Sequence, residues 1–119
     1  MKLLLFVIEN IKEDYYLIWQ IKELNKRGIK DIILDPGFGF AKDIQQNYDL
    51  LKNLNYFETL QLPILVGVSR KSMIYKALNT SAEEALNGTS ILHAWALERG
   101  SQLLRVHDIK EAREAIQLW

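Results

Sequence analysis

The sequence predicts an α/β fold in which three parallel strand–helix units follow one amphipathic helix. Three apolar runs, at residues 31–35, 64–69 and 103–107, are typical of parallel strands buried on both faces, and helix-period segments separate them. Each run ends in polar or charged residues. The carboxyl ends of parallel strands meet at one edge of a sheet, where α/β proteins bind ligands. We therefore predict one site built from three loops.

The composition is that of a single globular domain. The chain has 119 residues, 49% hydrophobic and 25% charged, and its 15 basic and 15 acidic residues cancel. This charge balance argues against nucleic-acid or membrane-surface partners. The absence of cysteine excludes disulfides and thiolate metal sites, and it is compatible with a cytoplasmic location.

Residues 1–8 are apolar but do not indicate a signal peptide or a membrane span. The run is short, Glu9 follows it directly, and it has no small-residue cleavage site. We expect a strand or the irregular start of a helix. Helical periodicity follows over residues 9–27, and Gly28 provides a stop. The aromatic residues of this helix are expected to pack in the core: Tyr15, Tyr16 and Trp19.

The strand at residues 31–35 leads into a glycine-rich loop. Its glycines allow unusual dihedrals and the close approach of a ligand, and the bulky Phe38 and Phe40 are expected to be exposed on it. An alternative is a plain strand-to-helix turn with Asp35 as a cap. A helix is expected over residues 44–60.

The strand at residues 64–69 should place Gly67 and Ser69 on its inner face, with Leu65, if helices cover the opposite face. That opposite face consists of Ile64, Val66 and Val68. Arg70, Lys71 and Ser72 follow, at the start of a helical piece, where two cations and a hydroxyl suit an anion or a polar ring edge. The alternative is a solvated basic turn.

Ser81 and Glu84 have the spacing of a capping box, which predicts a helix over residues 85–97 that residues 87–90 interrupt. His93 on this helix is interpreted as a packing or interface residue rather than a ligand.

The strand at residues 103–107 places Arg105 and His107 on the same face. Burying both would be costly without a function, although an internal ion pair with Asp35 or Asp108 is an alternative. Asp108 should cap a last helix over residues 109–118. The inner side of that helix is expected to carry Ala112, Ala115, Ile116 and Trp119.

Four motifs together resemble the C-terminal half of dihydropteroate synthases. They lie at residues 35–40, 66–72, 88–89 and 105–108, and the resemblance runs from about Ile8 to the C-terminus. The family folds as a (β/α)8 TIM barrel, so the resemblance implies that residues 1–119 are the C-terminal part of a pterin-binding barrel domain, an incomplete barrel. The family is a transferase of folate biosynthesis. It condenses 6-hydroxymethyl-dihydropterin pyrophosphate with p-aminobenzoate to dihydropteroate.

The resemblance also implies roles for individual residues. Asp35 would bind the amino-pyrimidine edge of the pterin, and Lys71 its carbonyl side. Arg105 would lie against the pterin ring and hold the departing pyrophosphate with His107. Lys71, Arg105 and His107 would thus be the catalytic residues, and Gly39 would keep its loop tight. The p-aminobenzoate pocket would be flanked by Phe40, Ser69, Arg70 and Ser72.

Loss of pyrophosphate to a pterin-methyl cation, followed by attack of the aniline nitrogen, would need mainly positioning and charge stabilisation. Mg²⁺ is expected on the pyrophosphate, with its protein ligand in the N-terminal half of the family, which has no counterpart here. We therefore expect little or no synthase activity from this chain alone. Open strand edges, and the family's dimerisation through its late helices, predict self-association.

Two other functions remain open. One is a pterin-dependent methyltransferase-type barrel, which shares the pterin-binding carboxylate but has no pyrophosphate to hold. The other is a non-catalytic truncated remnant that packs against a partner. Neither a nucleic acid nor a membrane is expected as a partner.

Overall fold

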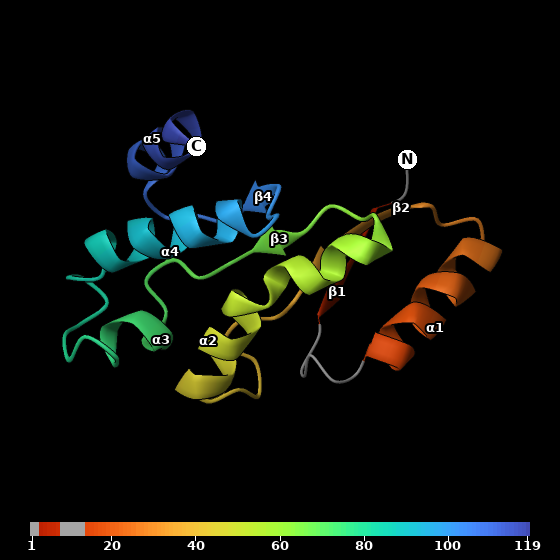
Figure 1. The fold of residues 1–119 in the computed structure, drawn as a ribbon, viewed down its shortest axis with the longest axis horizontal. Coiled ribbons are helices and arrows are strands. Elements are labelled where there is room, and N and C mark those ends of the chain that lie inside the picture. Colours follow the sequence, from red (N-terminus) through yellow and green to blue (C-terminus); the bar gives the residue numbers. More distant parts are fainter. Residues whose placement is uncertain (1–2, 8–13) are drawn as a thin grey trace.

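A computed structural model describes residues 3–7 and 14–119 of the chain (Figure 1). Its elements in order are β1 Leu3–Val7, α1 Asp14–Lys26, β2 Asp31–Asp35, α2 Ile44–Lys52, the 3-10 helix η2 Leu54–Leu60, β3 Leu65–Val66, α3 Ser72–Tyr75, α4 Leu86–Glu98, β4 Leu103–Leu104 and α5 Ile109–Leu118. Helix α1 and helix α5 lie at opposite ends of the molecule (Figure 1).

The described strands pair only in parallel, as the sequence predicts. Strand β1 pairs with β2, and β3 pairs with β4. A bridge between Leu34 and Ile64 joins the two pairs, and the Leu34 N–H donates to the Pro63 carbonyl at 2.8 Å. The prediction of three strands preceded by one helix is wrong in one respect, because Leu3–Val7 adds a strand before that helix. Of the two interpretations of residues 1–8, the strand is right for Leu3–Val7.

One face of the sheet is covered by helices. Alternate residues along β2 and β3 are fully buried on this face, and they pack with side chains of α2, η2, α3 and α4. They are Ile32, Leu34, Ile64, Val66 and Val68. The other face is more open, since Ile33, Leu65 and Gly67 are half-buried there and Arg105 and His107 are exposed. The predicted division of the β3 residues between the two faces is confirmed.

Several elements are shorter than the hydrophobic pattern predicts. Helix α2 stops at Lys52, and a 3-10 helix replaces the rest of the predicted helix over residues 44–60. Strand β3 covers only Leu65–Val66 and β4 only Leu103–Leu104. The ladder between these two strands ends before the side-chain contacts of Ser69 with His107 and of Arg70 with Asp108. The first five residues of the predicted helix over residues 9–27 lie outside the described part.

Helix α4 differs from its prediction at its start. It runs from Leu86 to Glu98 without a break at residues 87–90, and Ala85 rather than Ser81 is its N-cap. The predicted capping box does not form, since the Ser81 carbonyl instead accepts the Glu84 N–H in a turn. The continuous helix is possible because Gly88 and Thr89 face the buried side, where α3 packs closely.

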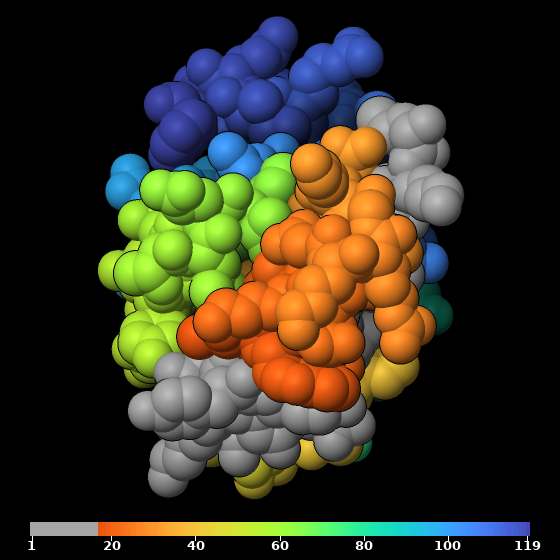
Figure 2. Space-filling view, turned by 90° about the vertical axis from the view of Figure 1, so that its right-hand side faces the viewer, coloured from red at the N-terminus to blue at the C-terminus, as the bar shows by residue number. Residues whose placement is uncertain are grey.

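The burial of some aromatic and apolar residues differs from its prediction. Phe38 is fully buried, whereas Phe40 is exposed as expected. Trp19 is exposed on α1, and Ile116 and Trp119 are exposed at the end of the chain rather than packed inward. Figure 2 shows α1 beside the η2 segment, with α5 at the top. Among the described residues, no helix is both long and apolar enough to cross a membrane.

Candidate functional site

Lys71 joins the loops that follow β2 and β3. It is the N-cap of α3, and its Nζ donates to the Phe38 carbonyl at 2.7 Å. The same Nζ lies 5.9 Å from the centre of the Phe40 ring, in the range of a cation–π contact. The ammonium group is thus held over the glycine-rich loop. Two of the three predicted loops therefore meet at one place.

Asp35 ends β2 beside this ammonium group. Its Oδ1 accepts the N–H of Gly37 at 2.9 Å, which is the turn cap that the sequence offered as an alternative. Burial lowers the pKa of Lys71, Asp35 opposes this shift, and Arg105 adds to it. A lysine at a strand end whose pKa is shifted by burial and by nearby charged side chains is typical of functional sites.

Asn47 holds the glycine-rich loop from the side of α2. Its Oδ1 accepts the Gly39 N–H at 2.8 Å, and its Nδ2 donates to the Asp43 carbonyl at 2.9 Å. Gly39 needs this support because its φ is +86°, a conformation that favours glycine. Asn47 is not among the predicted site residues. Its signal is a polar residue on the apolar face of a helix, one turn before the buried Leu50 and Leu51.

Gly67 separates two of the predicted cationic residues. A Cβ at this position would lie 3.7 Å from Lys71 Nζ and 3.8 Å from Arg105 Cβ. The glycine therefore leaves the space between the two side chains open. Lys71 and Arg105 come from neighbouring strand ends, as predicted, and a flat ligand could lie over this position.

Ser69 and His107 contact each other across the same strand ends. The His107 N–H donates to Ser69 Oγ at 3.3 Å, and His107 Nδ1 lies 2.8 Å from the same oxygen. Ser69 is buried, whereas His107 is exposed. Because a buried hydroxyl needs an acceptor for its proton, Nδ1 is best assigned as that acceptor, with the ring proton on Nε2. The exposed edge of the imidazole is then a hydrogen-bond donor.

Arg70 has a different environment from the other predicted residues. Its Nε and Nη2 donate to the two carboxylate oxygens of Asp108 at 2.9 and 3.0 Å, and its Nη1 donates to the carbonyls of Ala82 and Glu83 at 2.8 Å each. Hydrogen bonding to Asp108 raises the pKa of Arg70, and the same bond lowers the pKa of Asp108. The ion pair that the sequence analysis considered for Arg105 or His107 is thus made by Arg70.

Asp108 is the N-cap of α5, as predicted, but its side chain makes no cap hydrogen bond. The carboxylate is committed to Arg70 instead. Thr89 supports the same place, since its Oγ1 accepts the Arg70 N–H at 3.0 Å and donates to the Ala85 carbonyl. Ser72, the first residue of α3, is half-buried beside Lys71. The four predicted motifs therefore lie around one end of the sheet.

His93 lies on α4, one helical turn after Thr89. It is buried on α4, and its Nε2 has no hydrogen-bond partner among the described residues. Burial lowers its pKa, while the charge of Asp108 opposes that shift. The packing interpretation fits, although its ring is not fully satisfied. Within residues 3–7 and 14–119, no group of three or more acidic, histidine or cysteine residues could hold a metal ion.

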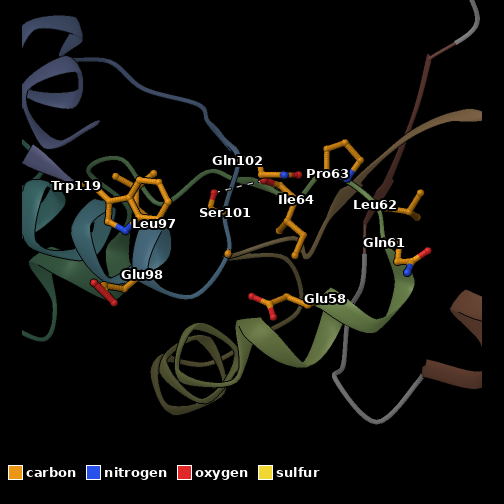
Figure 3. Close-up of a pocket in the computed structure, with 11 residues that line it drawn as sticks. Glu58, Gln61, Leu62, Pro63, Ile64, Leu97, Glu98, Ser101, Gln102 and Trp119 are labelled. Atoms are coloured by element: carbon orange, nitrogen blue, oxygen red, sulfur yellow. Dashed lines mark hydrogen bonds between the residues drawn. The ribbon is translucent and has the colours of Figure 1, made fainter. Parts of the chain in front are cut away.

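A pocket of about 580 Å³ lies elsewhere, at the opposite ends of β3 and β4 (Figure 3). It is lined by Glu58, Ile64, Ser101 and Trp119 among others, and by none of the predicted site residues. We place the candidate site at the loops rather than in this pocket, because Asp35, Lys71 and Arg105 lie near one another at the strand ends.

Comparison with known proteins agrees with the motifs. A family model described as pterin binding enzyme matches residues 9–107. The dihydropteroate synthase of Escherichia coli K12 is 44% identical over 105 residues, which cover 87% of this chain and 37% of that protein. The dihydropteroate synthase of Haemophilus influenzae is 37% identical over 115 residues, covering 93% of this chain and 42% of the relative.

Solved structures share this fold. The crystal structure of Yersinia pestis dihydropteroate synthase superposes with a TM-score of 0.89 at 34% identity, covering 96% of this chain and 55% of that one. The Thermus thermophilus dihydropteroate synthase in complex with 6HMPPP superposes with a TM-score of 0.87 at 30% identity. The match covers 98% of this chain and 51% of that one. The chain spans less than half the length of the Escherichia coli and Haemophilus influenzae relatives. It belongs to the family of pterin-binding enzymes, and the relatives named above are dihydropteroate synthases.

Proposed function

We propose that this chain provides the C-terminal part of a dihydropteroate synthase site, which condenses 6-hydroxymethyl-dihydropterin pyrophosphate with p-aminobenzoate. The observation that supports the proposal is that Lys71 lies near both Asp35 and Arg105, so that residues from three strand ends meet, in a member of the pterin-binding family. Residues 1–119 would then form the C-terminal part of a barrel domain whose remaining strands lie outside this chain. A cytoplasmic location stays an expectation.

Each group would have a role that its chemistry allows. Asp35 would accept paired N–H groups from the amino-pyrimidine edge of the pterin, because a carboxylate suits that geometry. Lys71 would donate to the carbonyl side of the ring. Burial already removes part of the water around its ammonium group and lowers its pKa, so a flat ring that covers it has less water to displace. Gly39 would keep the loop close to the ligand.

Arg105 and His107 would stabilise the leaving group. The bond between the pterin methylene carbon and the pyrophosphate oxygen breaks, and the pyrophosphate departs with the electron pair. A cation and an N–H donor at this position oppose the developing charge. The aniline nitrogen of p-aminobenzoate then forms a bond to the methylene carbon and loses a proton.

The p-aminobenzoate would lie beside Phe40, Ser69 and Ser72, with Arg70 behind them. The exposed ring of Phe40 offers an apolar wall, and the start of α3 offers hydroxyl and N–H donors. Magnesium would arrive with the pyrophosphate as part of the substrate. Its protein ligand would belong to the N-terminal half of the family's barrel, as the resemblance implies.

We propose that the chain associates with a second copy of itself through the late helices, α4 and α5. Helices α4 and α5 carry several exposed apolar side chains. Single scattered apolar residues are normal on a protein surface, whereas a group of them is typical of an interaction surface. They are Ile91, Trp95, Ile109, Ile116 and Leu118. Sedimentation should therefore detect a dimer or larger species, and a monodisperse monomer at high concentration would contradict this.

Calorimetric titration with a pterin pyrophosphate analogue and Mg²⁺ tests the function. We expect saturable binding to the 119-residue chain, weakened at least about tenfold in Lys71→Ala, because a charge-assisted hydrogen bond is lost. Lys76→Ala removes an exposed lysine from the next helical turn and should bind as the unaltered chain does. Preference for methyl-tetrahydrofolate would favour the methyltransferase alternative, and a folded chain that binds neither ligand would contradict the proposal.

A further inference from the structure

The backbone ladder between β3 and β4 ends early, but the register of the two strands does not. Leu65 pairs with Leu103 and Val66 with Leu104, and the last backbone bond runs from the Arg105 N–H to the Val66 carbonyl. Farther along, Ser69 contacts His107 and Arg70 contacts Asp108, each at a sequence separation of 38 residues. That separation is the one that also relates Leu65 to Leu103. Side chains thus continue the parallel register where the backbone no longer pairs.

The second side-chain contact is built to be rigid. Arg70 and Asp108 are matched in a two-pronged geometry, and their side chains are only 24% and 23% exposed. The carbonyls of Ala82 and Glu83 occupy the remaining terminal nitrogen of the guanidinium group. This guanidinium group therefore has little donor capacity left for a substrate.

The backbone of Arg70 is also held against its preference. Its φ of +53° lies in the left-handed region, which non-glycine residues rarely adopt. Thr89 accepts its N–H at 3.0 Å, so the chain is fixed from both the backbone and the side chain. Such over-determined, unfavourable conformations cluster at functional sites. Ser69 precedes this residue and Lys71 follows it.

We propose that Arg70 and Asp108 are positioning residues whose pairing continues the β3–β4 register and thereby sets Lys71 and His107 for an anionic ligand. This inference deepens the proposed function and rests on it for the identity of that ligand. Arg70 acts through the chain rather than by touching substrate. Thr89 is a positioning residue as well, because its Oγ1 accepts the Arg70 N–H.

The first test needs no ligand. Hydrogen exchange of the His107 amide and the ring-nitrogen signals of His107 are measured by NMR in the full chain, in Arg70→Lys and in Asp108→Asn. Lysine keeps the charge but not the fork, and asparagine keeps the shape but not the charge. We expect exchange at the His107 amide to rise at least about tenfold in both variants, as for loss of a charge-assisted pair. The ring signals should lose their hydrogen-bonded pattern.

Arg113→Lys is the matched control, because Arg113 is an exposed arginine on α5. It should leave His107 unchanged. If Arg70→Lys or Asp108→Asn fails to fold, Thr89→Val removes only the hydroxyl that accepts the Arg70 N–H. It should raise exchange at the His107 amide by a smaller amount. Unchanged His107 signals in the folded variants would overturn the proposal. An equal rise in exchange at Leu34, in the core of β2, would also overturn it, because the pair would then support the whole fold.

The second test adds the pterin pyrophosphate analogue with Mg²⁺. We expect about tenfold weaker binding in Arg70→Lys and Asp108→Asn than in the unaltered chain. If the unaltered chain does not bind the analogue while His107 still responds to the substitutions, the proposed function fails and the positioning pair stands. If the chain binds and the variants bind equally well, the positioning pair is wrong.

Discussion

The loop after β2 and the loops after β3 and β4 reach the same site by different means. The loop after β2 is held by residues close to it in sequence, through the bonds from Gly37 to Asp35 and from Gly39 to Asn47. The other two loops are held by contacts across the chain, between Ser69 and His107 and between Arg70 and Asp108. The first kind of support can form within a short segment, whereas the second requires the sheet to be in register. We therefore expect the two regions to respond differently to substitution.

The largest effect should come from the buried aromatic side chain of the first loop. Phe38→Ala should lower the free energy of unfolding by about 3–5 kcal/mol, because the ring is fully buried and its loss leaves a cavity. Phe40→Ala makes the same change two residues away at an exposed position and should cost less than about 1 kcal/mol. Urea unfolding of both variants measures this. Equal losses would mean that the loop is not anchored by Phe38.

A smaller effect should come from the packing that positions Thr89 and α3. A Cβ at Gly88 would meet Ile74 Cγ2 at 2.5 Å, so Gly88→Ala must displace either the Ile74 side chain or α3 itself. Overpacking of this kind costs about 1–3 kcal/mol, and we expect it to exceed the gain of about 1 kcal/mol in helix propensity. Asn87→Ala, at the exposed neighbouring position, should not destabilise. Thermal unfolding distinguishes them, and a stabilised Gly88→Ala would refute the close contact.

The local support of the first loop is tested by Asn47→Ala. The Gly39 N–H and the Asp43 carbonyl both lose a partner, which should cost about 1–3 kcal/mol. Asn55→Ala changes an exposed asparagine and serves as the control. Exchange should rise at the Gly39 amide and stay unchanged at His107. A matching rise at His107 would show that the two regions are not held independently.

The smallest effect concerns acid pH. Burial lowers the pKa of His93 in the folded state, so the unfolded chain binds more protons once the pH falls below about 6.5. This contribution to stability is therefore complete above that pH and is lost as the pH falls toward the folded pKa. His93→Leu should lose less stability than the unaltered chain between about pH 7.5 and about pH 5. Equal slopes in the two proteins would rule out His93 as the source.

The sequence was most informative about what is local. The strand at Asp31–Asp35, the division of β3 residues between two faces and the position of Asp108 at the start of α5 all follow from periodicity and turn chemistry. A real capping box was also present in the sequence, at Asp43 and Gln46. The sequence analysis chose Ser81 and Glu84 instead, which have the same spacing.

The carbonyls of Ala82 and Glu83, which follow Ser81, bind the guanidinium group of Arg70, and helix α4 begins only at Leu86. No local pattern in the sequence reports that distant contact.

Distant contacts also explain the other differences. The strand lengths were overestimated because an apolar run gives no signal for where backbone pairing stops and side-chain pairing begins. The partner of Arg70 could not be predicted, since it depends on a register of 38 residues between two strands. The burial of Phe38 likewise depends on the core that the later helices form.

The most direct test of the central claim is an amide NMR titration of the full chain with the pterin pyrophosphate analogue and Mg²⁺. If the strand ends form one site, the signals of Gly37, Gly39 and His107 should move along a single saturation curve, and Lys71→Ala should abolish all three responses. Separate curves for the two regions would contradict the claim. So would shifts confined to the pocket at Ile64, Ser101 and Trp119 (Figure 3).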